Sequence, residues 1–164
     1  MPAVFMVVVF LGLVFFGTRL VTDPESWATD ALGFAACLFL GARGLTVKRS
    51  DRKIAASPLL HEVLDQATLE EALASERAIL YKHSTRCPVS AVVVNDVLQV
   101  AGTHPEWTCY LLKVVEHRDL SDSVAEQLAV PHESPQVFVL NEGRLLWHAS
   151  HGEITADNLV GQLT

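Results

Sequence analysis

One cysteine of this chain stands where sulfur chemistry is favoured. Cys87 is followed directly by Pro88, at the start of a helix predicted to continue to about Ala101. Proline suits the first turn of a helix because no N–H is needed there. The positive end of the helix dipole favours a thiolate, which is the nucleophile of thiol–disulfide exchange. The sequence therefore predicts that Cys87 is a reactive cysteine, with Lys82 and Arg86 adding to the positive field if they point inward.

The C-x-x-C spacing of redox proteins is present here with only one thiol. In Cys87-Pro88-Val89-Ser90 a serine stands where a resolving cysteine would be. Such a site can attack a disulfide but cannot close an internal one, so an external thiol must resolve it. Ser90 either donates a hydrogen bond to the thiolate or is an ordinary helix residue. Cys109, in an apolar strand, and Cys37, in an apolar helix, are expected to be structural.

The elements that position Cys87 alternate between strands and helices. The apolar segment 59–64 is either an edge strand or the start of a helix, and a capping-box pattern opens a helix at Thr68. The further strands are predicted at 78–81, 108–115, 137–140 and 145–148, and the helices at 68–75, 88–101, 121–128 and 155–163. The order βαβαβαββα, with a crossover half and a hairpin half, is the α/β arrangement of the thioredoxin-like fold, a central mixed sheet flanked by helices.

The N-terminal part of the chain has a different composition. Half of the 164 residues are apolar and the mean hydropathy is +0.30, largely because of two apolar runs at 3–21 and 31–42. The first run is long enough to cross a bilayer, and it lacks the basic start and cleavage site of a signal peptide. We therefore expect two transmembrane helices in residues 1–45, a basic linker at 46–58 and a globular domain at 59–164. The alternative is a buried hairpin in a soluble protein.

Charge indicates the partners and the orientation of the chain. The net charge of −7 argues against nucleic-acid binding. Basic residues gather just after the second apolar run, at Arg43, Lys48, Arg49, Arg52 and Lys53. By the positive-inside rule this cluster is cytoplasmic. We therefore expect a protein of the cell membrane, held through residues 1–45, whose C-terminal domain faces the cytoplasm. A periplasmic thioredoxin-like protein would require the opposite topology.

Three segments resemble the YtxJ-like monothiol bacilliredoxins, which are thioredoxin-fold proteins. They are YKHSTRCPVSA at 81–91, VVEHRDLSDSVAEQLAV at 114–130 and PHESPQVFVLNEGRLLWHASHGEIT at 131–155. The resemblance covers about 59–164 and implies that Cys87 removes bacillithiol from S-bacillithiolated proteins. It further implies bacillithiol as co-substrate, no tightly bound cofactor, and dependence on the reductase system of bacillithiol disulfide.

The resemblance also assigns the residues around Cys87. Ser134-Pro135 matches the cis-proline loop, which in thioredoxin folds faces the reactive cysteine and pairs with the substrate backbone, and an X-Pro bond is where a cis peptide costs little. Glu133 and Gln136 would orient peptide or thiol. The predicted site thus consists of catalytic Cys87, the supporting loop residues Ser84, Thr85, Pro88 and Ser90, and the substrate-binding residues Glu133, Ser134, Pro135 and Gln136.

Metal or iron–sulfur cluster binding without redox turnover is the alternative function. His148-x-x-His151 has a ligand-like spacing and could form a mixed site with Cys87. Cluster-binding relatives usually have glycine after the cysteine, and Pro88 disfavours that geometry. We therefore expect no metal site. His83 and His132 are expected to make local hydrogen bonds or to bind carboxylates of the small thiol.

Overall fold

The computed structural model describes Val14 and residues 27–163, and the chain divides into two compact units, 1–45 and 46–164. Apart from Val14, the first apolar run lies outside the described residues. The second apolar run belongs to α2 (Trp27–Ala55), a single helix of 29 residues. Residues 46–55, expected as a linker, are the last turns of this helix and belong to the second unit.

The part of α2 in the first unit exposes large apolar side chains. Leu32, Phe39, Leu40 and Leu45 each have more than half of their surface exposed. Within Ala31–Ala55 of α2 the mean hydropathy of an 18-residue window reaches 1.4, and among the described residues this is the one helix long and apolar enough, by length and composition, to cross a membrane.

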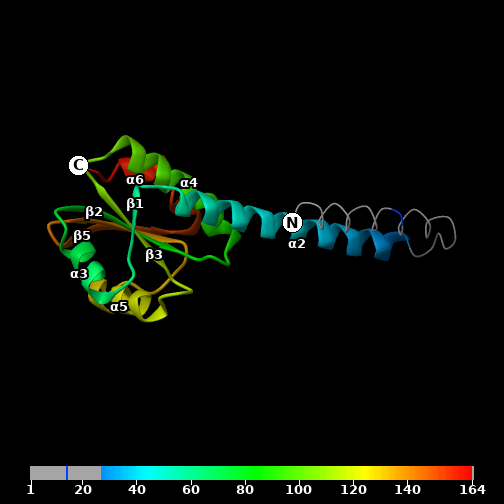
Figure 1. The fold of residues 1–164 in the computed structure, drawn as a ribbon, viewed down its shortest axis with the longest axis horizontal. Helices are drawn as coiled ribbons and strands as arrows, with labels where there is room; N and C mark the ends of the chain where they lie inside the picture. The colour runs from blue at the N-terminus through cyan, green and yellow to red at the C-terminus, as the bar shows by residue number, and fades with distance from the viewer. Residues whose placement is uncertain (1–13, 15–26, 164) are drawn as a thin grey trace. The chain divides into compact units, whose positions relative to one another are not determined.

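A five-stranded mixed sheet forms the centre of the second unit. Its strand order is β1-β3-β2-β4-β5 (Figure 1). Both β1 and β2 are parallel to β3, while β4 is antiparallel to β2 and to β5. The strands are β1 (Leu60–Glu62), β2 (Arg77–His83), β3 (Thr108–Lys113), β4 (Gln136–Asn141) and β5 (Arg144–Ser150). The segment after Leu59 is therefore an edge strand.

Helices cover both faces of the sheet. On one face lie α4 (Pro88–Thr103) and α6 (Ala156–Val160), and on the other α3 (Gln66–Ala74) and α5 (Arg118–Leu128) (Figure 1). A 3₁₀ turn, η1 (His151–Glu153), precedes α6. The element order βαβαβαββα that the sequence predicts is confirmed.

Three helix boundaries differ from those predicted. Asp65, rather than Thr68, caps α3, because its carboxylate accepts the Thr68 amide at 2.8 Å. The helix α5 begins at Arg118 rather than at 121, and α6 ends at Val160 rather than at 163. Capping residues compete locally, and hydrophobic spacing does not decide among them.

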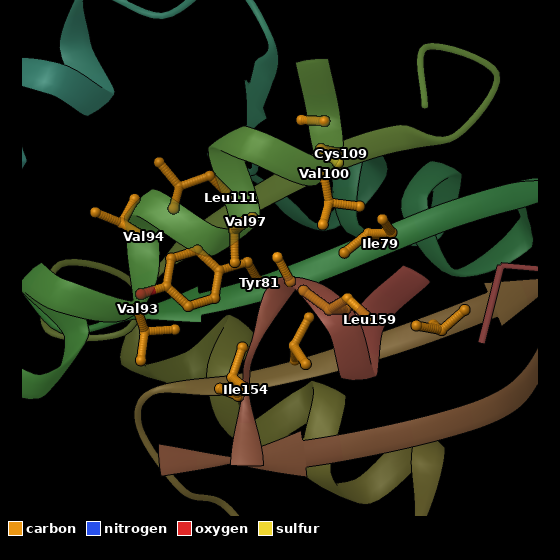
Figure 2. Packing of buried hydrophobic residues seen from close by; sticks show 14 of the residues in the cluster. Ile79, Tyr81, Val93, Val94, Val97, Val100, Cys109, Leu111, Ile154 and Leu159 are labelled. Atoms are coloured by element: carbon orange, nitrogen blue, oxygen red, sulfur yellow. The ribbon is translucent and has the colours of Figure 1, made fainter. Parts of the chain in front are cut away.

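Alternation along β2 gives the two faces of the sheet different neighbours. Successive side chains of a strand point to opposite faces. Ile79 and Tyr81 belong to the core cluster beneath α4 and α6 (Figure 2), and Leu80 belongs to the cluster beneath α3 and α5. By the same alternation, His83 lies on the α4 face and Lys82 on the α5 face.

The last turns of α2 are built into the first of these clusters. Ile54 is only 6% exposed and belongs to the same cluster as Val93, Val94 and Val97 of α4. Ser50, one turn earlier, is buried as well. Burying an isoleucine side chain contributes about 2 kcal/mol, so this end of α2 is part of the folded domain.

Candidate active site

Three loops meet at one end of the sheet. His83, the last residue of β2, pairs with Lys113 at the end of β3, and Lys82 pairs with Gln136 at the start of β4. The segments that follow β2, follow β3 and precede β4 are therefore neighbours. The topology brings the loop of Cys87 and the loop of Pro135 to the same edge of the sheet.

Cys87 is the N-cap residue of α4. Its backbone is extended, with φ −99° and ψ 120°, and Pro88 occupies the start of the helix. The Cys87 amide donates to the Ser84 carbonyl at 3.2 Å, and the Ala91 amide donates to the Cys87 carbonyl at 3.2 Å. The half-buried thiol thus stands at the positive end of a helix of 16 residues, which favours an anion.

Ser90 is fully buried beneath this turn. Its hydroxyl accepts a hydrogen bond from the Ser84 amide at 3.3 Å, and its carbonyl accepts one from the Tyr81 hydroxyl at 3.0 Å. Ser90 therefore links the reactive loop to the first turn of α4. This loop-bracing contact to the backbone is not one of the two roles expected for Ser90, and donation to the thiolate stays a prediction.

The rest of the reactive loop is tied to its neighbours. Thr85 donates from Oγ1 to Oε1 of Glu116 at 2.9 Å, which joins this loop to the segment after β3. The Ser84 hydroxyl accepts the Arg86 amide at 3.4 Å. Arg86 itself is exposed.

Lys82 does not point inward toward Cys87, which was the condition for it to add to the positive field there. It is fully buried on the α5 face, where Nζ donates to the Ser121 carbonyl at 3.1 Å and lies 5.9 Å from the centre of the Phe138 ring. Burial lowers the pKa of Lys82 to about 8, against the opposing effect of Asp122. Strand alternation is the reason, because neighbours of His83 along β2 must point to the other face.

Lys82 gives a testable pH dependence of stability. Because its pKa falls below the value of 10.5 on folding, the unfolded chain binds more protons between about pH 8 and 10.5, and stability rises through that window. Lys82→Met is expected to raise the free energy of unfolding by about 1–3 kcal/mol at pH 7, with a smaller gain at pH 10. Urea unfolding at both pH values measures this, and exposed Arg77→Met is the control. Equal gains at both pH values would contradict the assignment.

The loop before β4 has the geometry that the resemblance implied. The Ser134–Pro135 peptide bond is cis, and the buried Pro135 offers its carbonyl to the His151 amide at 3.0 Å. The Ser134 hydroxyl oxygen is buried and has no hydrogen-bond partner among the described residues. This loop therefore presents an unused polar atom at the same sheet edge as Cys87.

Gln136 holds the loop in place. Its side-chain oxygen accepts the Glu133 amide at 3.3 Å, and its side-chain nitrogen donates to the Pro131 carbonyl at 3.1 Å. Gln136 is only 2% exposed, and these two hydrogen bonds give it a bracing role, while its contact with a substrate stays a prediction. Glu133 is exposed and remains accessible.

The histidines separate into different environments. His83 is 1% exposed and its Nδ1 lies 3.1 Å from the Tyr81 hydroxyl, so of the two roles expected for it the structure shows a local hydrogen bond. His132 is half-buried, with Nδ1 3.0 Å from the Ser121 hydroxyl, and burial followed by the charge of Lys82 lowers its pKa. His148 is exposed on β5, and His151 follows that strand. Within residues 27–163 no group of three His, Cys, Asp or Glu side chains could hold a metal ion.

Three residues near the reactive loop were not predicted as a unit. The Tyr81 hydroxyl lies 3.1 Å from Nδ1 of His83, and Nε2 of His83 lies 3.6 Å from Oδ1 of Asp51 on α2. The alternation of β2 could have placed Tyr81 and His83 together. Asp51 carried no such signal, because its segment read as a linker.

A mixed sheet of this order, with a cysteine starting the helix after β2 and a cis-proline before β4, defines a thioredoxin-fold thiol oxidoreductase. The family model described as monothiol bacilliredoxin BrxC matches residues 59–159, so the chain belongs to the monothiol bacilliredoxin family.

Solved structures agree on the fold. A thioredoxin-fold protein described as a candidate oxidoreductase is 28% identical, with a TM-score of 0.60 over 63% of this chain and 93% of that one. Mitochondrial thioredoxin 3 of Saccharomyces cerevisiae is 11% identical (TM-score 0.53; 63% and 92% covered). A mutant thioredoxin of Halobacterium salinarum is 16% identical (TM-score 0.53; 66% and 91% covered).

Proposed function

We propose that this protein removes bacillithiol, or a similar small thiol, from protein mixed disulfides through Cys87, while the N-terminal apolar segment holds it at the cytoplasmic face of the cell membrane. S-bacillithiolated proteins are then its substrates. Bacillithiol is its co-substrate, and a separate disulfide reductase regenerates that thiol.

The observation that carries this proposal is the isolation of Cys87 within the second unit. Ser90 fills the position of a resolving thiol. Cys109 pairs with Ile79, four residues before the end of β2, and so lies about 13 Å from that end. It is buried, and burial raises the pKa of its thiol to about 12. A disulfide needs Cα atoms within about 7 Å, so neither position can resolve an adduct on Cys87.

Turnover then requires two exchange steps. The Cys87 thiolate attacks the small-thiol sulfur of the mixed disulfide, the S–S bond breaks, and the substrate protein leaves as a thiolate that takes up a proton. A second small thiol, as its thiolate, attacks the new adduct on Cys87. The S–S bond to Cys87 breaks, the Cys87 thiolate returns, and the two small thiols leave as their oxidised disulfide.

The loop of Ser134 and Pro135 is the proposed binding surface for the substrate. It lies at the sheet edge of Cys87, and the buried Ser134 hydroxyl lacks a partner within the described chain. A bound peptide or small thiol would satisfy this oxygen, since a buried polar group without a partner costs free energy. Exposed Glu133 lies beside it.

The proposed location rests on charge and on chemistry. The basic residues after Leu45 favour the cytoplasmic side by the positive-inside rule. A site with one thiol also needs a reduced small-thiol pool, which the cytoplasm maintains and oxidising compartments do not.

The test follows one adduct through a single turnover. The full chain in detergent, reduced and freed of small thiol, is mixed with a substrate protein carrying bacillithiol on one cysteine. Mass spectrometry is expected to find bacillithiol on Cys87, and added bacillithiol to remove it. Parallel substrates carrying glutathione or coenzyme A identify the preferred thiol. Failure of any adduct to move to Cys87 would refute the proposal.

A further inference from the structure

We propose that Asp51 and the buried His83 form a pair that holds a proton beside the reactive loop, which makes Asp51 a positioning residue for the thiolate of Cys87. The inference deepens the proposed function and rests on its assignment of Cys87 as the reactive thiol. It gives α2 a role in the chemistry of the domain.

A continuous line of polar contacts leads from α2 to the first turn of α4. Oδ1 of Asp51 lies 3.6 Å from Nε2 of His83, and Nδ1 of His83 lies 3.1 Å from the Tyr81 hydroxyl. That hydroxyl donates to the Ser90 carbonyl at 3.0 Å. The Ser90 hydroxyl in turn accepts the Ser84 amide in the loop that carries Cys87.

The hydrogen atoms of Tyr81 and His83 are too few for every contact in this line. A carbonyl can only accept, so the single hydroxyl hydrogen of Tyr81 points to Ser90. Nδ1 of His83 must then be the donor to the Tyr81 oxygen. With a neutral ring, Nε2 would present a lone pair to the carboxylate of Asp51, and neither buried atom would have a hydrogen to share. A proton on this pair removes the conflict.

The proton and a thiolate at Cys87 stabilise each other. Burial raises the pKa of Tyr81, the residue that contacts His83, and a negative charge on Cys87 acts in the same direction. Opposite charges near one another favour both charged forms. Deprotonation of His83 would instead let Nδ1 accept from Tyr81, and the Ser90 carbonyl would lose its side-chain partner.

Some neighbours of His83 disfavour an extra proton on its ring, and others favour it. Burial is the largest influence and lowers the pKa of His83 below its usual value. Lys113 of β3 acts in the same direction, and Asp51 and Glu116 offset this lowering only in part. The Asp51 side chain is 41% exposed. It lines a pocket of about 370 Å³ together with Thr85 and Glu116, so protons can exchange with solvent there.

Asp51 lies before the residues 59–159 that the family model matches. It is supplied by α2, and the burial of Ser50 and Ile54 fixes that part of the helix against the domain. A chain limited to the matched residues 59–159 would thus lack the carboxylate that holds the proton.

The test measures how fast Cys87 is alkylated as pH varies. Full chain in detergent is treated with iodoacetamide between pH 5 and 9, and the modified Cys87 peptide is quantified by mass spectrometry. Asp51→Asn is expected to lower the rate at pH 7 roughly three- to tenfold and to move the profile to higher pH. Asp51→Glu is expected to restore most of the rate.

Two comparisons separate a proton-holding role from a structural one. Lys53→Gln, on the same helix, should leave the profile unchanged. His83→Gln should shift it as Asp51→Asn does, and adding Asp51→Asn to that variant should shift it no further. The inference would be overturned if Asp51→Asn left the alkylation profile unchanged. It would also be overturned if adding Asp51→Asn to the His83→Gln variant shifted the profile as much as Asp51→Asn does alone. An unreactive Cys87 in the unmodified chain would instead refute the proposed function.

Discussion

Replacing Cys87 by serine is expected to abolish removal of the small thiol from a mixed-disulfide substrate. An alcohol supplies no anion near neutral pH, so the first exchange step cannot occur. The rate should fall to that of the uncatalysed exchange with free thiol, at least a hundredfold below that of the unmodified chain, by order of magnitude for loss of a nucleophile. Release of the adduct, followed by mass spectrometry, measures it.

Cys109 provides the matched control. Its side chain is 2% exposed in β3, so Cys109→Ala removes a thiol without touching the reactive loop. We expect the exchange rate to stay within about twofold, with a small loss of stability from the missing sulfur. A folded Cys109→Ala variant without activity would show that the site uses two thiols.

Deleting residues 1–45 is expected to convert the protein from a membrane protein to a soluble one with unchanged exchange activity. The deletion removes the exposed apolar residues of α2 and keeps the buried Ser50 and Ile54 together with Asp51. Fractionation of cells and the small-substrate assay measure the two effects. A soluble full-length chain would contradict membrane attachment.

The position of the cut distinguishes the anchor from the domain. Deleting residues 1–58 removes Ile54 from the core, which should lower the free energy of unfolding by about 2 kcal/mol or more. The alkylation profile of Cys87 should also shift, because Asp51 is absent. If the two truncated chains had the same free energy of unfolding and the same alkylation profile, the last turns of α2 would contribute neither to the stability of the domain nor to the reactivity of Cys87.

Orientation needs a separate measurement. A fluorescent reporter fused after residue 164 should be active if the domain faces the cytoplasm. Alkaline phosphatase activity of the corresponding fusion, without fluorescence, would place the domain outside and remove the reduced small-thiol pool from its reach.

Much of the fold could be predicted because its signals are local. The apolar runs of β2, β3 and β4 identify buried strands, and Cys87-Pro88 marks a helix start. Boundaries were less certain where several capping residues stand close together, as at Asp65 and Thr68. The choice there depends on which side chain reaches the free amide.

The site was harder to predict because it joins segments distant in the chain. The cysteine and the cis-proline loop have recognisable neighbours in the sequence. The direction of Lys82 could have been inferred from the alternation of β2. The contact between Asp51 and His83 could not, since nothing in a charged stretch after an apolar run indicates that one carboxylate will be packed against a strand.

The buried hydroxyl of Ser90 also decides how this site responds to oxidants. A peroxide would convert a reactive Cys87 to its sulfenic acid. Proteins with a second cysteine in the helix escape further oxidation by closing a disulfide at once. With Ser90 at that position, rescue must come from a small thiol that condenses with the sulfenic acid before a second peroxide yields the irreversible sulfinic acid. If the proposed function holds, the supply of that thiol therefore sets both the turnover of the protein and its survival under oxidative stress.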